Sequence, residues 1–147
     1  MNHEQTIRNY YAAWLRDDLD AVFALCTDDL IAVNVPIGPI HGKAAAREFF
    51  EKFGRGMSQK RYDIERILVS GDAAAVEGVE NYLKKGKAVS LPYMSMFRFA
   101  ADGRIQEWRD YFDVQTILRQ LGLPLERASL ALGHGSRPLK EAAASVS

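Results

Sequence analysis

The stretch AVSLPYMSMFRFAADGRIQEWRDYF, residues 88–112, decides the fold of this chain of 147 residues. Alternating polar and apolar residues on both sides of the turn signal ADG predict two antiparallel strands. Two earlier runs, RYDIERILVS at residues 61–70 and AAAVEGVENYL at residues 73–83, have the same character and end at SGD and KKGK. The four runs together predict a long antiparallel meander.

The first sixty residues follow a helical period instead. Apolar residues recur at spacings of three and four over about residues 3–16, over residues 19–26 and between Gly42 and Gly54. One strand, LIAVNVP at residues 30–36, interrupts these helices, and VQTILRQL at residues 114–121 predicts a short last helix. Helices on one side of an antiparallel sheet form an α+β layer fold, and strand twist curls the sheet around them into a cone.

Length and charge restrict the class of protein. We expect residues 1–124 to form one domain with one core, and residues 125–147, rich in Ala, Ser and Gly, to form a weakly ordered tail. The 19 basic and 19 acidic residues give a net charge of +0, which offers no long-range attraction to nucleic acid or anionic lipid. No run resembles a signal peptide or a membrane helix, and one cysteine, Cys26, allows no internal disulfide. A cytoplasmic protein is the expectation.

Strand alternation predicts which side chains face the inside of the cone. Asp110 shares a face of its strand with Trp108 and Phe112, and two large aromatic residues normally turn such a face toward the core. Burial of an ionised carboxylate is costly unless it is paired or its pKa rises, so a buried Asp110 indicates a functional group. The alternative register turns Ile105, Arg109 and Tyr111 inward and leaves Asp110 in solvent.

Two further polar residues and a set of apolar residues are candidates for the inner face. Glu80 shares a face with Gly78 and Tyr82, although a strand glutamate is ordinarily exposed. Asn34 precedes Pro36 by two residues, where its amide binds either a ligand or the backbone. The core or pocket wall that contacts a substrate is expected to contain Trp108, Phe112, Tyr93, Leu91, Tyr82, Phe49 and Phe53.

Other common sites are absent from the sequence. His3, His41 and His134 are too far apart in the chain to form a metal-binding pair, so no metal is expected. There is no glycine-rich phosphate loop and no G-x-S-x-G element, which disfavours nucleotide binding and serine hydrolysis. Cys26, on an apolar helix face, is expected to pack in the core.

On these residues the chain resembles the limonene epoxide hydrolases and, more distantly, the SnoaL-like polyketide cyclases and the ketosteroid isomerases of the nuclear transport factor two-like superfamily. The resemblance covers about residues 4–124. It rests on NVP at residues 34–36, on PIHGKAAAREFF at residues 39–50 and above all on WRDYFD at residues 108–113. It implies a cystatin-like cone with a deep apolar pocket, a small apolar substrate, no cofactor and a homodimer.

The resemblance also implies a mechanism for adding water to an epoxide. A general-base aspartate activates the water, a second carboxylic acid protonates the epoxide oxygen, and an arginine bridges the two acids. By motif the base corresponds to Asp110, the amide that holds the water to Asn34, and the acid to Glu80 on a neighbouring strand. Gly78 stands where the family has the arginine, and Ala32 where it has a tyrosine.

These two differences predict altered electrostatics and a larger pocket. Without the arginine the two carboxylates repel each other, so one of them holds a proton at neutral pH, as acid–base catalysis requires. The space left at Gly78 and Ala32 favours a bulky polycyclic or terpenoid substrate.

Two other functions stay open. In a proton-transfer enzyme, an isomerase or cyclase, Asp110 would move a proton next to a carbonyl, and a tyrosine or protonated Glu80 would stabilise the enolate. In a non-catalytic domain, the pocket would hold an apolar ligand or the chain would simply dimerise. The resemblance puts such a dimer contact on the outer sheet face, near Met94, Met96 and Arg98.

Overall fold

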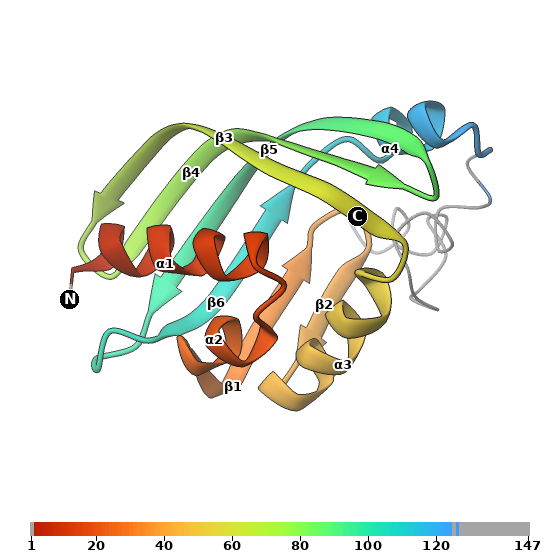
Figure 1. Cartoon of the computed structure of the whole chain (residues 1–147). Helices are drawn as coiled ribbons and strands as arrows, with labels where there is room; N and C mark the ends of the chain where they lie inside the picture. The colour runs from red at the N-terminus through yellow and green to blue at the C-terminus, as the bar shows by residue number, and fades with distance from the viewer. Residues whose placement is uncertain (1, 125, 127–147) are drawn as a thin grey trace, which may run out of the picture.

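One curved sheet of six strands, in the order β2-β1-β6-β5-β4-β3, wraps around the helices in the computed structural model (Figure 1). The structure describes residues 2–124 and 126. In chain order the elements are α1 (His3–Leu15), α2 (Leu19–Ala24), β1 (Cys26–Asn34), β2 (Gly38–His41), α3 (Lys43–Phe53), β3 (Met57–Ser70), β4 (Ala73–Lys84), β5 (Lys87–Phe99), β6 (Ile105–Tyr111) and α4 (Val114–Leu121).

The predicted α+β cone is confirmed. Strands β3 to β6 form the antiparallel meander, and α1 and α3 pack on the concave side of the sheet, as Figure 1 shows. The early strand β1 pairs in parallel with the last strand β6, and in that register Asn34 lies opposite Asp110. Two residues 76 positions apart in the chain, both predicted for the site, are therefore neighbours in the sheet.

The structure corrects the boundaries of two predicted elements. The helix predicted over residues 19–26 ends at Ala24, because Cys26 already pairs with Ile105 as the first residue of β1. Cys26 is still fully buried, as expected, but in the sheet. The residues after β1 also contain a short strand that was not predicted. The chain reverses after Asn34, and β2 pairs antiparallel with β1. A strand that contains Pro39 is tolerated at the edge of a sheet.

Trp108 is the centre of the core between the sheet and the helices. Its side chain is fully buried, and its ring lies 5.3 Å from that of Tyr10 on α1, 5.7 Å from that of Phe50 on α3 and 6.1 Å from that of Phe23 on α2. Edge-to-face and tilted contacts at these distances are favourable for aromatic rings. One tryptophan of β6 thereby fixes all three N-terminal helices against the concave face.

The register of β6 is the predicted one at its functional end. Arg109 and Tyr111 are exposed, whereas Asp110 faces the inside, so the alternative register is wrong. The alternation fails only at the start of the strand, where Ile105 is also buried. Between Arg98 and Phe99 the β5–β6 pairing shifts by one residue, and this bulge turns Ile105 back toward the core.

The outer face of the sheet carries several exposed apolar side chains, among them Met94, Met96 and Tyr111. The homodimer expected through this face stays a prediction, as does a cytoplasmic location. Across the described part of the chain, no helix has both the length and the hydropathy needed to cross a bilayer. The predicted tail, residues 125–147, lies outside the described residues except for residue 126, so its predicted weak order also stays a prediction.

Candidate active site

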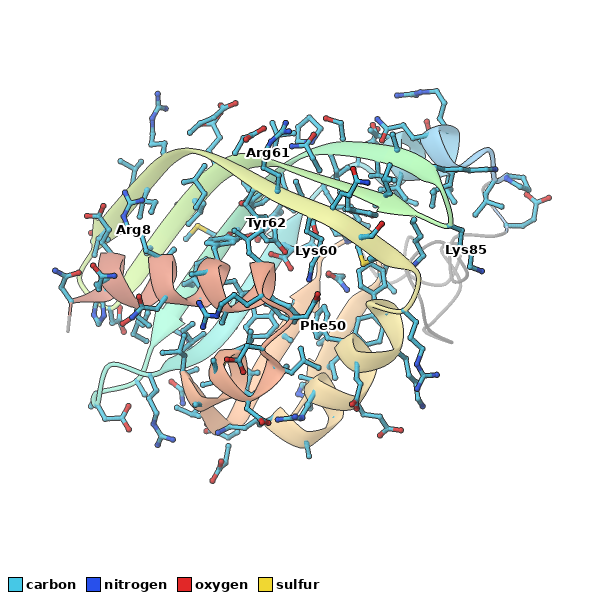
Figure 2. The ribbon with its side chains drawn as sticks, in the orientation of Figure 1. Arg8, Phe50, Lys60, Arg61, Tyr62 and Lys85 are labelled. Carbon is cyan, nitrogen blue, oxygen red and sulfur yellow. The ribbon has the colours of Figure 1, made fainter. Side chains whose placement is uncertain are left out.

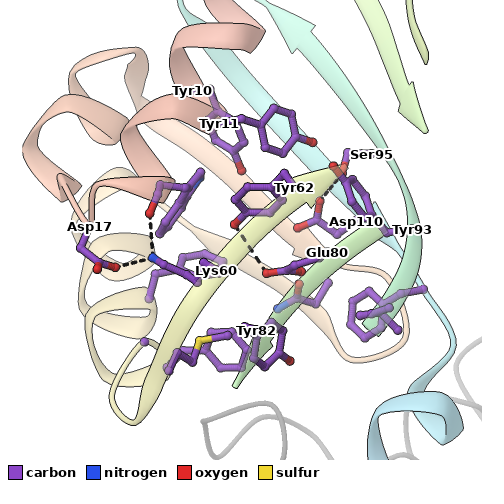
Figure 3. A pocket seen from close by; sticks show the side chains of 18 of the residues that line it. Tyr10, Tyr11, Asp17, Lys60, Tyr62, Glu80, Tyr82, Tyr93, Ser95 and Asp110 are labelled. Carbon is purple, nitrogen blue, oxygen red and sulfur yellow. Dashed lines mark hydrogen bonds and ion pairs between the residues drawn. The ribbon is translucent and has the colours of Figure 1, made fainter. Parts of the chain in front are cut away.

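A cavity of about 300 Å³ opens between the concave face of the sheet and helices α1, α3 and α4 (Figure 3). Its wall is largely aromatic and aliphatic, and most of the aromatic residues come from α1, α3 and the strands β3 to β5. The polar groups that reach it from the sheet are Asn34, Lys60, Tyr62, Glu80, Tyr82, Tyr93, Ser95 and Asp110.

Asp110 is held by a serine on the adjacent strand. Asp110 and Ser95 are directly opposite in the β5–β6 register, and the Ser95 hydroxyl donates a hydrogen bond of 2.5 Å to Asp110 Oδ1. Burial raises the pKa of Asp110 to about 6, and the bond from Ser95 opposes that rise. Because the bond favours the ionised form, Asp110 is the carboxyl that loses its proton first.

Glu80 lies in the same cavity with a different set of partners. The Tyr62 hydroxyl donates to Glu80 Oε1 at 3.5 Å, from the opposite position on β3. Burial and then the charge of Asp110 raise the pKa of Glu80 to about 7, while Lys60 and the bond from Tyr62 act in the opposite direction. Near neutral pH the pair therefore holds one proton, and Glu80 is the group that holds it.

The two carboxyls do not come from neighbouring strands, contrary to the sequence prediction. Glu80 is on β4 and Asp110 on β6, and β5 runs between them. The curvature of the sheet turns both side chains into one cavity, as Figure 3 shows. Asn34 lines this cavity too, next to Asp110 on β1, so the structure brings the three predicted catalytic residues together.

Five of the seven predicted wall residues line the cavity: Phe112, Tyr93, Leu91, Tyr82 and Phe53. Trp108 and Phe49 do not; Trp108 lies in the core behind the wall, and Phe50 takes the lining position on α3. Alternation and helical period indicate the side that a residue faces but not its depth, which explains both misplacements.

The expected enlargement at Gly78 and Ala32 is wrong. A Cβ atom at Gly78 would lie 2.7 Å from the Asp63 carbonyl oxygen and 3.1 Å from the Tyr93 hydroxyl, so Tyr93 already covers this position. Ala32 is 1% exposed, belongs to the core cluster and is not part of the cavity wall. Neighbouring atoms fill the space at both positions.

Several polar residues that line the cavity were not predicted for the site from the sequence, among them Tyr10, Tyr11, Lys60, Tyr62 and Ser95. Tyr10 and Tyr11 lie in the predicted helix over residues 3–16, whose period indicates a buried face but not a cavity. Tyr62 and Ser95 follow the alternation of their strands and were open to prediction. Lys60 continues the alternation of Tyr62, but it lies outside the strand predicted over residues 61–70, because β3 begins at Met57 in the structure.

No three potential metal-ligating side chains come together anywhere in the described ranges. His3 stacks on Phe99, with ring centroids 4.0 Å apart, and does not reach the cavity. His134 lies outside the described residues. The polar side chains that line the cavity supply carboxyl, amide, hydroxyl, ammonium and guanidinium groups.

Comparisons with known proteins give the family and the fold of the chain. Residues 7–108 match the model of the SnoaL-like domain family. The chain is 29% identical over 115 residues to epoxide hydrolase EphG of Mycobacterium tuberculosis, covering 78% of this chain and 76% of that protein.

Solved structures give the same result for the fold. A limonene epoxide hydrolase-like epoxide hydrolase from M. tuberculosis superposes with a TM-score of 0.71 at 27% identity, over 81% of this chain and 88% of that one. An NTF2-like protein of unknown function from Burkholderia pseudomallei gives 0.73 at 24% identity, over 82% and 97%.

The close approach at Gly78 leads to a stability prediction. Gly78→Ala should lower the free energy of unfolding by about 1–3 kcal/mol in urea titrations, because the added methyl group overpacks the inner face. Adding Tyr93→Phe should restore only part of the loss, since the Asp63 carbonyl stays in place. An unchanged free energy of unfolding for Gly78→Ala would contradict the close packing described here.

Proposed function

The chain belongs to the SnoaL-like domain family, and from this premise we propose that it adds water to the epoxide ring of an apolar small molecule. One observation carries the proposal. Glu80 and Asp110 reach a single aromatic-walled cavity, where burial raises the pKa of both; the charge of Asp110 adds to the rise at Glu80, and the bond from Ser95 opposes the rise at Asp110. A pair of this kind supplies one acid and one base at the same pH.

In the proposed reaction, Asp110 accepts a proton from a water molecule while the water oxygen attacks an epoxide carbon. The carbon–oxygen bond of the ring breaks, its electron pair goes to the epoxide oxygen, and Glu80 protonates that oxygen. The product is a vicinal diol. Return of the proton from Asp110 to Glu80 restores the starting state.

The other polar groups have defined places in this scheme. Asn34, opposite Asp110 in the sheet, would orient the attacking water. Ser95 holds the Asp110 carboxylate, and Tyr62 contacts the Glu80 carboxyl. The aromatic wall would bind the apolar part of the substrate and exclude bulk water. The similarity to an epoxide hydrolase of M. tuberculosis supports the same reaction type.

A second candidate function follows from the tyrosines of the cavity. Burial raises the pKa of Tyr10, Tyr11, Tyr62 and Tyr93, so their hydroxyls stay protonated and can donate hydrogen bonds. Such donors stabilise an enolate oxygen. With Asp110 as the base, the site would then move a proton next to a carbonyl, as an isomerase or cyclase does.

Variants of the two acids test the proposed reaction. We expect Asp110→Asn and Glu80→Gln each to lower kcat for epoxide hydrolysis by about 10²–10⁴-fold, because each removes one proton-transfer step. Turnover in ¹⁸O-labelled water, followed by mass spectrometry of the diol, measures the reaction. Glu77→Gln, on the same strand and paired with exposed Arg66, is the matched control.

The outcomes separate the candidate functions. Full diol formation by Asp110→Asn would contradict its role as base. Deuterium exchange into a ketone substrate without hydrolysis would favour the proton-transfer enzyme. Saturable binding of apolar ligands with neither reaction would leave a binding domain.

The pH dependence provides a second check of the proposal. The base must be ionised and the acid protonated, so kcat/KM, which reports the groups of the free protein, should rise as pH passes about 6 and fall as it passes about 7. These are values of the coupled pair. In Glu80→Gln the residual rate should lose its alkaline fall, because no acid remains to titrate. A flat profile from pH 5 to pH 8 for the unaltered protein would contradict the acid–base pair.

A further inference from the structure

We propose that Lys60 is a positioning residue for the acid of this site: its ammonium group stabilises the negative charge that forms on Glu80, and Asp17 controls how much of that positive charge Glu80 experiences. The inference rests on the proposed function and deepens it, because it adds a third charged group to the pair of acids.

Lys60 lies on the concave face of β3, next to an irregularity in the strand. Ser58 pairs with Leu83 on β4, but the next pair is Arg61 with Asn81, so β3 has one residue more than β4 here. Gln59, within this bulge, has a φ of 53°, a left-handed conformation that is unfavourable for residues other than glycine. Figure 2 shows Lys60 and Tyr62 on the concave side of β3 and Arg61 on the outer side.

The end of α1 holds the ammonium group in place. Lys60 Nζ donates to the Trp14 carbonyl at 2.7 Å and to the carboxylate of Asp17, and only 12% of the Lys60 side chain is exposed. Asp17 has a φ of 56° and a side chain that is 78% exposed. An ammonium group has three N–H donors, and these two bonds use two of them. The ammonium group is thereby held at the wall of the cavity that Lys60 shares with Glu80.

Lys60 is the positive charge among the groups that act on Glu80. These groups are Lys60 and Tyr62 on β3 and Asp110 on β6. Tyr82 on β4 and Tyr93 on β5 face Glu80 as well, and its charge raises their pKa values. Asp110 raises the pKa of Glu80 and Lys60 lowers it.

Two further charged residues, Glu51 on α3 and Arg55 just beyond it, line the same cavity. Neither is among the groups that shift Glu80. A charge in a site with little water acts more strongly than one in solvent. The balance at Glu80 therefore depends on Lys60 and, through its ion pair, on Asp17.

The proposed reaction creates the need for this cation. When Glu80 gives its proton to the epoxide oxygen, a carboxylate forms inside an apolar cavity. A positive charge from β4 has no room, because Gly78 is covered by Tyr93 and the Asp63 carbonyl. Lys60 brings the charge from the neighbouring strand β3 instead.

Two substitutions of opposite sign test the inference. Lys60→Met removes the charge and keeps most of the stem, so kcat should fall about tenfold, while the alkaline limb of the kcat/KM profile moves to higher pH by about one unit. Asp17→Asn removes only the counter-charge, and asparagine tolerates the left-handed conformation. Asp17→Asn should move the alkaline limb to lower pH. Lys60→Arg keeps the positive charge and should leave the limb near its position in the unaltered protein.

A titration without substrate separates this inference from the proposed function. In protein labelled with ¹³C at the glutamate carboxyls, the Glu80 signal is the one missing from Glu80→Gln. Its pKa should be higher in Lys60→Met and lower in Asp17→Asn. These shifts in a protein without epoxide turnover would refute the proposed reaction but keep the role of Lys60.

Unchanged Glu80 titration in both variants, with normal epoxide turnover by the unaltered protein, would overturn the role of Lys60. If Lys60→Met does not fold, Asp17→Asn and Lys60→Arg decide alone. Shifts of the Glu80 pKa in the same direction in Lys60→Met and Asp17→Asn would also overturn it. A charge effect moves the pKa in opposite directions in these two variants, whereas a purely structural disturbance has no reason to do so.

Discussion

The cost of keeping two carboxyl groups away from bulk water is the constraint on which this structure depends. Glu80 and Asp110 face a cavity walled by aromatic rings, where the ionised form of each loses the solvation that water gives it. The site can hold both only because one proton, one serine, one tyrosine and one lysine reduce that cost. The serine, Ser95, comes from β5, and the tyrosine and the lysine, Tyr62 and Lys60, come from β3.

The fold assembles this environment from elements that are distant in the chain. Trp108 fixes the three N-terminal helices against the concave face, and these helices carry much of the aromatic wall. The parallel pairing of β1 with β6 puts Asn34 opposite Asp110, and the antiparallel pairing of β5 with β6 does the same for Ser95. The two acids differ because Ser95 binds one of them and the charge of Asp110 acts on the other.

Strand alternation was enough to predict the inward direction of Asp110 and Glu80, because both lie in regular parts of β6 and β4. It failed for Ile105, which lies beside a bulge that shifts the register by one residue, and it did not reach Lys60, which precedes the predicted strand over residues 61–70. It also overestimated the space at Gly78, because the absence of a side chain says nothing about the Tyr93 ring that covers it. Local pattern fixes direction, whereas depth and filling depend on contacts between distant strands.

The dependence of stability on pH tests the central claim most directly. Burial raises the pKa of Glu80 from 4.5 to about 7 and that of Asp110 from 3.8 to about 6. Because the folded state binds these protons more tightly, the stability they contribute is present at low pH and is lost as pH rises through 6 and 7. Urea unfolding of the Glu80→Gln/Asp110→Asn double variant and of the unaltered protein should be compared at pH 5 and pH 8. The account predicts that the variant gains about 2–4 kcal/mol relative to the unaltered protein between these two pH values. The same difference at both would mean that the carboxyls are solvated, and would contradict it.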